Sequence, residues 1–349
     1  MAYSDIKDPS AYFQTKTYTG TNNSNALTND GNSDLKPDFI WIKRRDYDNG
    51  HQLLDSTRGV DKILGSELSS AETTLANRLS SFDTNGFTVE SSSGAFNASG
   101  EPFVAWQWKA NSGTTSSNTD GTITTTTQVN SDAGFSIVTW AGGGTGTLGH
   151  GLGEVPDMWI VKNRDYAVSW SVGFSDSSIL GGTSNYLSLN TTGAIATYNN
   201  IWGSSPVNSS VITMAGDRSV NISGDDYVAY FFKAKQGYSK FGKYVGNGNA
   251  NGAFVYTGFK PAFVMTKNTS ATDSWVIMDE KRSPSNVANK YLLADTSGAE
   301  GTNFDMFDFV SNGFKCRRAT SQNASGNTFI YMAFAENPFV AGGIPTTAR

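Results

Sequence analysis

The sequence predicts an all-β protein built of three tandem antiparallel β-sandwich units of a jelly-roll-like kind. Three observations lead to this prediction: two short patterns recur three times each, turn signals are dense, and the composition is poor in charge. Charged residues make up only 16% of the 349 residues, whereas aromatic residues make up 12%. This balance is typical of sheet proteins with long loops, because a helical protein would carry more Ala, Leu, Glu and Lys.

The first recurring pattern is a proline, an apolar run and a lysine six residues after the proline. It reads PDFIWIK, PDMWIVK and PAFVMTK, at Pro37–Lys43, Pro156–Lys162 and Pro261–Lys267. The second pattern follows 60 to 65 residues later and begins at Asn97, Asn221 and Asn323. Two patterns in a fixed order at nearly fixed separation indicate three copies of one unit of ~100 residues.

The repeats divide the chain into units at 1–111, 134–235 and 236–339. The stretch 112–133 is rich in Ser, Thr and Asn, so it is interpreted as a linker, with an edge strand as the alternative because of its β-branched residues. Units two and three follow each other almost without a gap. The last residues, 340–349, are interpreted as a frayed tail.

The second pattern contains the clearest strand of each unit. Phe103–Lys109 alternates between two faces, and its equivalents Tyr227–Lys233 and Phe329–Phe334 are apolar on both faces. Strands of this kind lie in the middle of a sheet that is covered on both sides. We therefore expect equivalent, buried positions for three side chains: Trp106, Tyr230 and Met332.

Each first pattern predicts another buried strand that opens at its proline, where the missing N–H costs least. The three prolines should therefore stand at equivalent strand starts. One further stretch, Ser70–Phe82, places Leu75, Leu79 and Phe82 on one helical face, which predicts a short helix in unit one.

Charge and cysteine content exclude several classes of protein. The net charge of −5 gives no electrostatic footprint for nucleic acid. No apolar run approaches the ~20 residues that span a membrane, and the N-terminus lacks the pattern of a secretory signal. The single cysteine, Cys316, excludes internal disulfides and favours synthesis in a cytoplasm. The only histidines, His51 and His150, lie in different units, so no metal site or other cofactor is predicted.

The lysine that ends the first pattern recurs in all three units, as Lys43, Lys162 and Lys267. One interpretation is a contact to an acidic glycan or to a carboxylate of a neighbour. The alternative is a strand-end lysine whose stem covers apolar surface while its ammonium stays in water. We favour the alternative, because strand-end lysines are common.

Two units share an Asp-x-x-Arg motif after the first pattern. Asp55 and Arg58 of unit one correspond to Asp279 and Arg282 of unit three, whereas unit two has Phe174 and Ser177 at these positions. A recurring carboxylate and guanidinium predict a turn held by a structural ion pair. A catalytic carboxylate is the weaker hypothesis, because glycoside cleavage generally needs two and no partner recurs.

Two tryptophans also occupy one repeat position, 14 residues after the proline. Trp170 and Trp275 stand there in units two and three, and His51 stands there in unit one. An exposed tryptophan could stack on a sugar ring. A tryptophan buried against the core is the commoner case and is the favoured interpretation.

Several segments together resemble a known family in their amino-acid sequence. They include the opening DPSAYFQTKTYTG, NSDLKPDFIWIKRRD, DSTRGVDKIL, FVAWQWKA, FSIVTWAGGGT, GHGLGEVPDMWIVKNRD and GYSKFGKYVGNGNANGAFVYTGFKPAFVM. These segments resemble repeat-containing structural or tail-fibre-like proteins of tailed marine bacteriophages, cyanophages among them. The resemblance covers nearly the whole chain. It implies a place in the virion and brings no catalytic or binding residues with it.

The expected function is therefore that of a virion structural protein, made in the host cytoplasm and placed in the tail or a fibre-like appendage, where it contributes to host-surface attachment. The expected partners are other virion proteins, further copies of the chain and a host-surface glycan, and neither nucleic acid nor membrane. A first alternative is a purely architectural capsid-decorating or tail-joining subunit. A second is a glycan depolymerase, which the missing carboxylate pair disfavours, so no enzyme is predicted.

Overall fold

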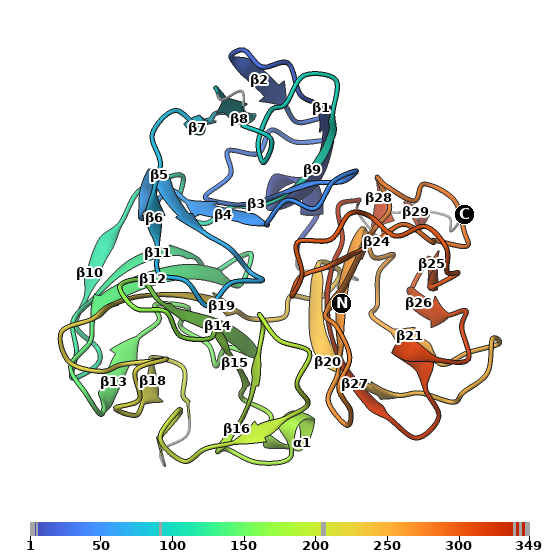
Figure 1. Cartoon of the computed structure of the whole chain (residues 1–349). Helices are drawn as coiled ribbons and strands as arrows, with labels where there is room; N and C mark the ends of the chain where they lie inside the picture. Colours follow the sequence, from blue (N-terminus) through green and yellow to red (C-terminus); the bar gives the residue numbers. More distant parts are fainter. Residues whose placement is uncertain are drawn as a thin grey trace.

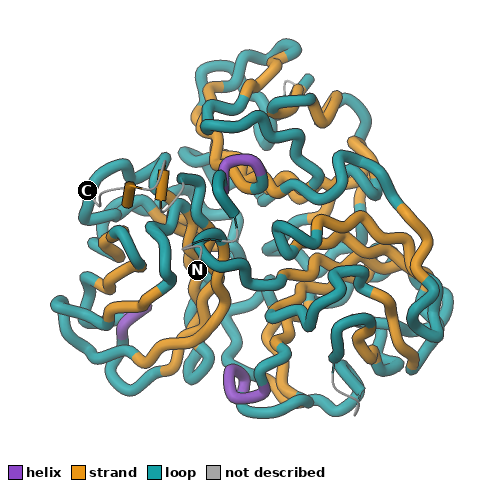
Figure 2. Tube along the Cα trace, turned by 180° about the vertical axis from the view of Figure 1, so that it is seen from behind, coloured by secondary structure: helices purple, strands orange, loops and turns teal. Residues whose placement is uncertain are grey.

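The computed structural model describes residues 4, 6–90, 93–203, 207–337, 340–341 and 344–345. Its strands gather into three groups arranged around a common centre (Figure 1). We call these groups unit one (β1–β9), unit two (β10–β19) and unit three (β20–β27). The view from behind shows the same three-part arrangement, with helix confined to short pieces (Figure 2).

Unit one consists of a six-stranded sheet, in the order β1-β9-β3-β4-β5-β6, and a three-stranded sheet, in the order β2-β8-β7. Its strands are β1 (Phe13–Thr19), β2 (Asn25–Thr28), β3 (Phe39–Arg44), β4 (Gln52–Asp55), β5 (Gly59–Leu64), β6 (Thr73–Thr74), β7 (Leu79–Asp83), β8 (Gly86–Val89) and β9 (Pro102–Trp108).

Unit two has an eight-stranded sheet, in the order β10-β11-β12-β19-β14-β15-β16-β17, and the pair β13-β18. Its strands are β10 (Ser116–Asn118), β11 (Thr125–Asn130), β12 (Phe135–Ala141), β13 (Gly146–Gly149), β14 (Met158–Asn163), β15 (Ser171–Phe174), β16 (Asn185–Ser188), β17 (Ala196–Thr197), β18 (Val211–Met214) and β19 (Asp226–Phe232).

Unit three has a five-stranded sheet, in the order β20-β27-β22-β23-β24, and a three-stranded sheet, in the order β21-β26-β25. Its strands are β20 (Ser239–Val245), β21 (Phe254–Tyr256), β22 (Phe263–Asn268), β23 (Val276–Asp279), β24 (Tyr291–Leu293), β25 (Phe307–Val310), β26 (Gly313–Cys316) and β27 (Thr328–Phe334). The short elements left are η1 (Pro9–Ala11), α1 (Ser177–Leu180), η2 (Ser321–Asn323), β28 (Val340–Ala341) and β29 (Ile344–Pro345).

The three large sheets share one strand order. In each, the first long strand pairs with the last, and the last pairs with the strand of the proline pattern. The strands β3, β14 and β22 each begin two residues after the proline. The N–H that follows the proline donates to an equivalent carbonyl oxygen in every unit, at 2.7 to 2.8 Å from Trp108, Phe232 and Phe334. The predicted equivalence of the strand starts is therefore confirmed.

Each last strand buries both of its faces. In β9, Val104, Trp106 and Trp108 join a central apolar core, whereas Phe103 and Ala105 face a core of unit one alone. The strands β19 and β27 alternate in the same way. The predicted equivalents Trp106, Tyr230 and Met332 are all buried, at 0%, 1% and 4% exposure. Because the central core takes side chains from all three units, they form one body.

The asparagine that opens the second pattern clamps a loop in every unit. The side-chain oxygens of Asn97, Asn221 and Asn323 accept hydrogen bonds from the N–H groups of Thr21, Gly143 and Asn247, at 2.9, 3.3 and 3.0 Å. All three asparagines are fully buried. Each buried amide therefore fixes the turn that follows the first long strand by accepting a hydrogen bond from its backbone.

The all-β class is confirmed, because strands make up 41% and helices 3% of the structure. The pairs of named strands in the described part of the chain are antiparallel, and Ile123 forms an isolated parallel bridge with Leu148. The shared core distinguishes the arrangement from separate sandwiches joined in tandem. The stretch 112–133 forms β10 and β11 at one edge of the sheet of unit two. Most of the expected tail, 340–349, lies outside the described residues; only the short strands β28 and β29 fall within it.

The helix predicted at Ser70–Phe82 is wrong. This stretch forms β6 and β7 instead, and Leu75 is exposed. The pairing of β7 with β8 shifts register between Leu79 and Ser81. Such a bulge brings residues three apart onto one face of a strand, which imitates helical spacing. Leu79 and Phe82 both contact the core of unit one for this reason.

We expect residues 1–111 alone to show no cooperative thermal unfolding transition. An isolated unit one would leave Val104, Trp106 and Trp108 in water, and each such side chain contributes about 1.5–3 kcal/mol when buried. Circular dichroism melts of this fragment, of residues 112–349 and of their co-purified mixture test the expectation. A sharp transition for 1–111 by itself would contradict the single shared core.

Candidate functional site

The side chains that stand 14 residues after the proline of each repeat make hydrogen bonds to a neighbouring unit. The indole Nε1 of Trp170 donates to the Gly65 carbonyl of unit one, and that of Trp275 donates to the Ser188 carbonyl of unit two, both at 2.9 Å. His51 Nε2 lies 3.0 Å from the Leu293 carbonyl of unit three. The three acceptors stand at equivalent places, in or just after the strands β5, β16 and β24, so the contacts form a closed ring.

We call the contact of unit two with unit one the first interface, that of unit one with unit three the second, and that of unit three with unit two the third. Each also carries one equivalent backbone hydrogen bond. These bonds are Glu72 N to Arg164 O at 2.7 Å, Glu300 N to Arg45 O at 2.6 Å, and Ile195 N to Thr269 O at 3.2 Å. The ring therefore closes by one geometry used three times.

The ligand contacts considered for Trp170, Trp275 and the three lysines do not fit the structure. Both tryptophans and all three lysines are buried, at 1% exposure or less. The tryptophans contact the neighbouring unit instead of solvent. The sequence alternative of a buried tryptophan against the core describes them, and both belong to the central core.

The repeated lysines differ from both sequence interpretations, because their ammonium groups lie inside the protein. Lys43 Nζ donates to the carbonyls of Arg44 and Tyr47 at 2.7 and 3.2 Å. Lys162 Nζ bonds the Asn163 carbonyl at 2.8 Å and reaches across the first interface to the Ser69 carbonyl at 3.1 Å. Burial lowers the pKa of all three to about 8. The lysines close hairpin ends by satisfying backbone oxygens.

Lys267 does the same at the third interface. Its Nζ donates to the carbonyl of Asp273 in its own hairpin at 2.6 Å and to that of Thr192 in unit two at 2.8 Å. The carbonyls of Ser69 and Thr192 each stand three residues before the backbone N–H that crosses their interface. Lys162 and Lys267 therefore bond equivalent oxygens of the neighbouring unit.

The two Asp-x-x-Arg motifs form fully buried ion pairs. Arg58 Nε lies 2.6 Å from Asp55 Oδ2, and Arg282 Nε lies 2.6 Å from Asp279 Oδ2. Each aspartate also binds the next unit: Tyr230 OH donates to Asp55 at 2.8 Å, and Trp106 Nε1 donates to Asp279 at 3.0 Å. Both pairs therefore lie at interfaces between units.

Each pair extends into a network that crosses its interface. At the first interface, Glu72 accepts from Arg58 of its own unit at 2.7 Å and from Arg164 of unit two at 2.9 and 3.0 Å. Burial would raise the pKa of Glu72, but the two guanidiniums lower it overall. At the second interface, Glu300 holds Arg282 and Arg45 in the same way, at 3.0 and 2.8 Å.

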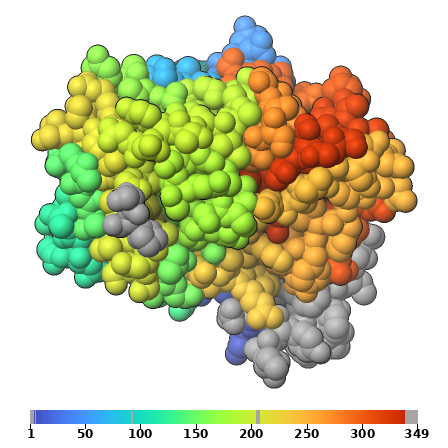
Figure 3. All heavy atoms as spheres, turned by 90° about the horizontal axis from the view of Figure 1, so that it is seen from below, coloured from blue at the N-terminus to red at the C-terminus, as the bar shows by residue number. Residues whose placement is uncertain are grey.

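The third interface has no equivalent network among the described residues. Thr269 replaces the arginine, Ile195 replaces the glutamate, and Phe174 and Ser177 replace the Asp-x-x-Arg pair. Apolar side chains from the end of β15 and from α1 fill this place, including Phe174, Ile179 and Leu180 of the central core. Units two and three abut there in the space-filling view (Figure 3).

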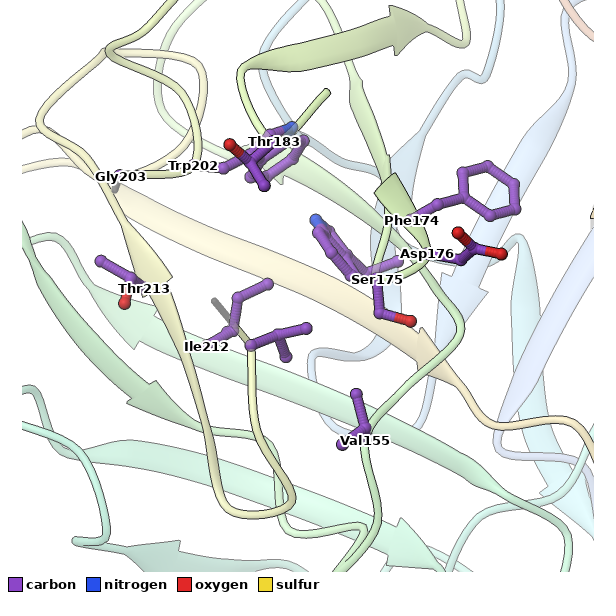
Figure 4. Close-up of a pocket in the computed structure, with 11 residues that line it drawn as sticks. Val155, Phe174, Ser175, Asp176, Thr183, Trp202, Gly203, Ile212 and Thr213 are labelled. Atoms are coloured by element: carbon purple, nitrogen blue, oxygen red, sulfur yellow. The ribbon is translucent and has the colours of Figure 1, made fainter. Parts of the chain in front are cut away.

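A pocket of about 260 Å³ opens in unit two, between the large sheet and β18 (Figure 4). In this view Ser175 and Asp176 lie on one side and Ile212 and Thr213 on the other. Its apolar lining is Val155, Trp159, Phe174, Trp202, Gly203, Val207 and Ile212. Its polar lining is Ser175, Asp176, Thr183 and Thr213.

The pocket depends on a substitution found in unit two alone. Trp159 of β14 stands opposite Gly173 of β15, whereas the equivalent pairs are Ile40 with Leu54 and Val264 with Met278. A Cβ on Gly173 would lie 2.5 Å from the Trp159 indole, so only glycine leaves room for the ring. Where units one and three pair two apolar side chains, unit two therefore has the Trp159 ring lying over the backbone of Gly173.

The polar groups of the pocket are largely unused by the fold. The Nε1 of Trp159, which is 4% exposed, has no hydrogen-bond partner among the described residues. Asp176 uses one carboxylate oxygen to accept from Ser178 N at 2.8 Å. The indole N–H lies against the Gly173 backbone, so the exposed carboxylate of Asp176 is the charged group that the pocket presents among its described lining residues.

The described part of the chain offers no group of three or more His, Cys, Asp or Glu side chains arranged to hold a metal ion. Within the same residues no helix has the length and apolar character needed to cross a bilayer. Comparing the three repeats in sequence did not predict the pocket, although two differences of unit two pointed to it. Unit two lacks the Asp-x-x-Arg motif, and it pairs Trp159 with a glycine.

We expect Glu72→Gln to lower the free energy of unfolding by about 3 kcal/mol, because it leaves the buried Arg58 and the nearby Arg164 without their shared carboxylate. Urea unfolding of the whole chain measures this. Glu300→Gln should cost a similar amount at the second interface. Asp30→Asn removes an exposed carboxylate that pairs with Lys16 and with Lys281 of unit three, and should cost less than about 1 kcal/mol. Equal effects of all three variants would rule out a special role for the networks.

His51 should make the chain sensitive to acid. Trp41 Nε1 donates to its Nδ1 at 2.8 Å, and burial lowers the pKa of His51 to about 3. The unfolded chain binds a proton near pH 6.5 and the folded chain does not, so this contribution to stability is present above pH 6.5 and is lost as the pH falls toward 3. Between pH 7 and 4.5 the loss should be about 2–3 kcal/mol.

The difference between the parent chain and His51→Gln isolates this contribution, because glutamine keeps a donor for the Leu293 carbonyl and does not titrate. Urea midpoints at pH 7 and 4.5 measure it. We expect the acid loss to be smaller in the variant. Parallel pH profiles of the two chains would show that His51 does not titrate as argued.

One family model matches the chain. It is described as a domain of unknown function (DUF7483), and it covers residues 8–338. No curated protein and no solved structure matches the chain. The match runs through all three units, the interfaces between them and the pocket of unit two, so the chain belongs to the DUF7483 family.

Proposed function

We propose that the chain is a structural protein of a tailed-bacteriophage virion, placed in the tail or a fibre-like appendage, and that it contributes to attachment at the host surface. Two separate arguments support the two parts of this proposal. The resemblance of its segments to tail-fibre-like phage proteins supports the location in the virion. The pocket of unit two supports the attachment.

The attachment part of the proposal rests on one observation: the pocket occurs in the unit that departs from the repeat pattern. Units one and three keep the Asp-x-x-Arg pair and the aliphatic strand pair, and both features serve packing. Unit two gives up both: apolar side chains fill the place of the Asp-x-x-Arg pair, and the pocket lies over the changed strand pair, Trp159 and Gly173. A change that served packing alone would fill this space. A partly open pocket with aromatic walls and unused polar groups suits a ligand.

The rest of the chain suits a rigid carrier for such a site. The three units share one core, and interfaces with many hydrogen bonds close the ring between them. A small pocket gives weak binding for one copy. Many copies held on one particle add such contacts through their effective concentration, so we propose that the chain acts as a homo-oligomer or on a scaffold of other virion proteins.

An architectural role is the second candidate, and one observation favours it. Strand β21 lies at the edge of the small sheet of unit three, and its Phe254 and Tyr256 are 49% and 58% exposed. An edge strand with exposed aromatic side chains suits docking on another protein. A glycan depolymerase has less support, because Asp176 is the only carboxylate among the described lining residues and cleavage generally uses two.

Two measurements test the proposed function. Antibody against the chain should label intact particles of the phage that encodes it in negative-stain electron microscopy. The chain displayed in many copies on beads should bind host cells, whereas the free monomer should bind weakly. Absence of label would remove the virion proposal, and labelled particles without cell binding would leave the architectural role.

A further inference from the structure

We propose that the pocket of unit two binds a single neutral hexopyranose ring. This inference rests on the proposed attachment function and names the ligand class of the same site. A pyranose carries an apolar C–H face and a rim of hydroxyl groups. A site for it therefore needs a flat aromatic wall together with several hydrogen-bonding groups that the fold has left free.

The aromatic walls are rigid. The rings of Trp159 and Trp202 meet edge to face at 90°, with their centroids 5.4 Å apart. Trp202 Nε1 donates to the Asn185 carbonyl at 3.1 Å, and Trp159 lies against the bare backbone of Gly173. Both rings are therefore held in place before a ligand arrives, which reduces the entropy lost on binding.

The pocket also offers groups that can form hydrogen bonds with a sugar. The Nε1 of Trp159 is not one of them, because it is covered and lies against the backbone of Gly173. The hydroxyl groups of Ser175, Thr183 and Thr213 line the same pocket, and each can donate and accept. Asp176 adds a carboxylate at the rim that accepts bonds from ligand hydroxyls.

The volume and charge of the pocket narrow the ligand further. A volume of about 260 Å³ lies just below the range of roughly 300–1,000 Å³ usual for small-molecule sites, so one ring fits and an extended oligosaccharide does not. None of the described lining residues is cationic, which disfavours a sialic or uronic acid as the ligand. An organic cation on the aromatic walls would be drawn to Asp176, but that site would leave the hydroxyl groups unused.

Binding is tested with the purified whole chain and four probes: the methyl glycosides of glucose, galactose, mannose and N-acetylglucosamine. Saturation-transfer NMR shows contact, and titration gives the Kd. We expect at least one glycoside to bind with a Kd in the millimolar range, with the strongest transfer to the C–H protons of one ring face. Tetramethylammonium serves as the cation probe.

A matched pair of variants locates the binding. Val155 lines the pocket and is 38% exposed, so Val155→Trp fills the pocket without entering the core. Val245 on β20 of unit three is 57% exposed and lies outside the pocket, so Val245→Trp is the control. We expect Val155→Trp to weaken sugar binding at least tenfold and Val245→Trp to leave it unchanged. Equal melting temperatures of the three chains exclude unfolding as the cause.

Each other outcome overturns the inference. No binding of any glycoside, or binding that survives Val155→Trp, would show that the pocket is not a hexopyranose site. Binding of tetramethylammonium that is lost in Asp176→Asn, without sugar binding, would make it a cation site. The proposed function is judged separately. If no sugar binds but labelled virions bind cells, the proposed function stands and the sugar site falls. If a sugar binds but virions are not labelled, the sugar site stands and the virion proposal falls.

Discussion

The central core, to which all three units contribute, is the constraint on which the rest of the structure depends. Each large sheet is apolar on both faces, because residues on its last strand alternate between the central core and the core of its own unit. A sheet with two apolar faces needs two covers. Its small sheet provides one, and the other two units provide the second. The three units therefore complete one another's burial.

A shared core of this kind needs interfaces that exclude water, and the chain repeats one solution three times. A hairpin end of one unit meets the outer strands of the next, where an indole or imidazole N–H and a backbone N–H each find an oxygen across the boundary. Among the described residues, ion networks add to the first and second interfaces. At the third, Phe174 and Ile195 stand in their place, so that interface closes without a carboxylate–guanidinium network.

Much of the fold can be predicted from the sequence, because the pattern of apolar residues along a strand shows which of its faces are buried. The proline starts, the two-faced last strands and the burial of Trp106, Tyr230 and Met332 were predictable from local patterns. The spacing of Leu79 and Phe82 led to the wrong prediction of a helix, because a β-bulge and a helical turn both bring residues three apart onto one side. The lysine environments were not predictable, because Lys162 and Lys267 complete their hydrogen bonds across interfaces between units. The pocket was missed because strands and loops distant in sequence line it, although the lost Asp-x-x-Arg motif was a signal.

The pocket shows how a repeated architecture can acquire a site. Three identical units would bury equivalent positions in the same way and leave little room for a ligand. Unit two escapes this condition, because its Phe174 and α1 seal the third interface without the Asp-x-x-Arg turn. The outer face of β14 and β15 is then free to pair Trp159 with Gly173. The two intact networks add to the stability of the ring while one unit departs from the pattern, so the ion networks and the proposed binding site belong to different copies of the same fold.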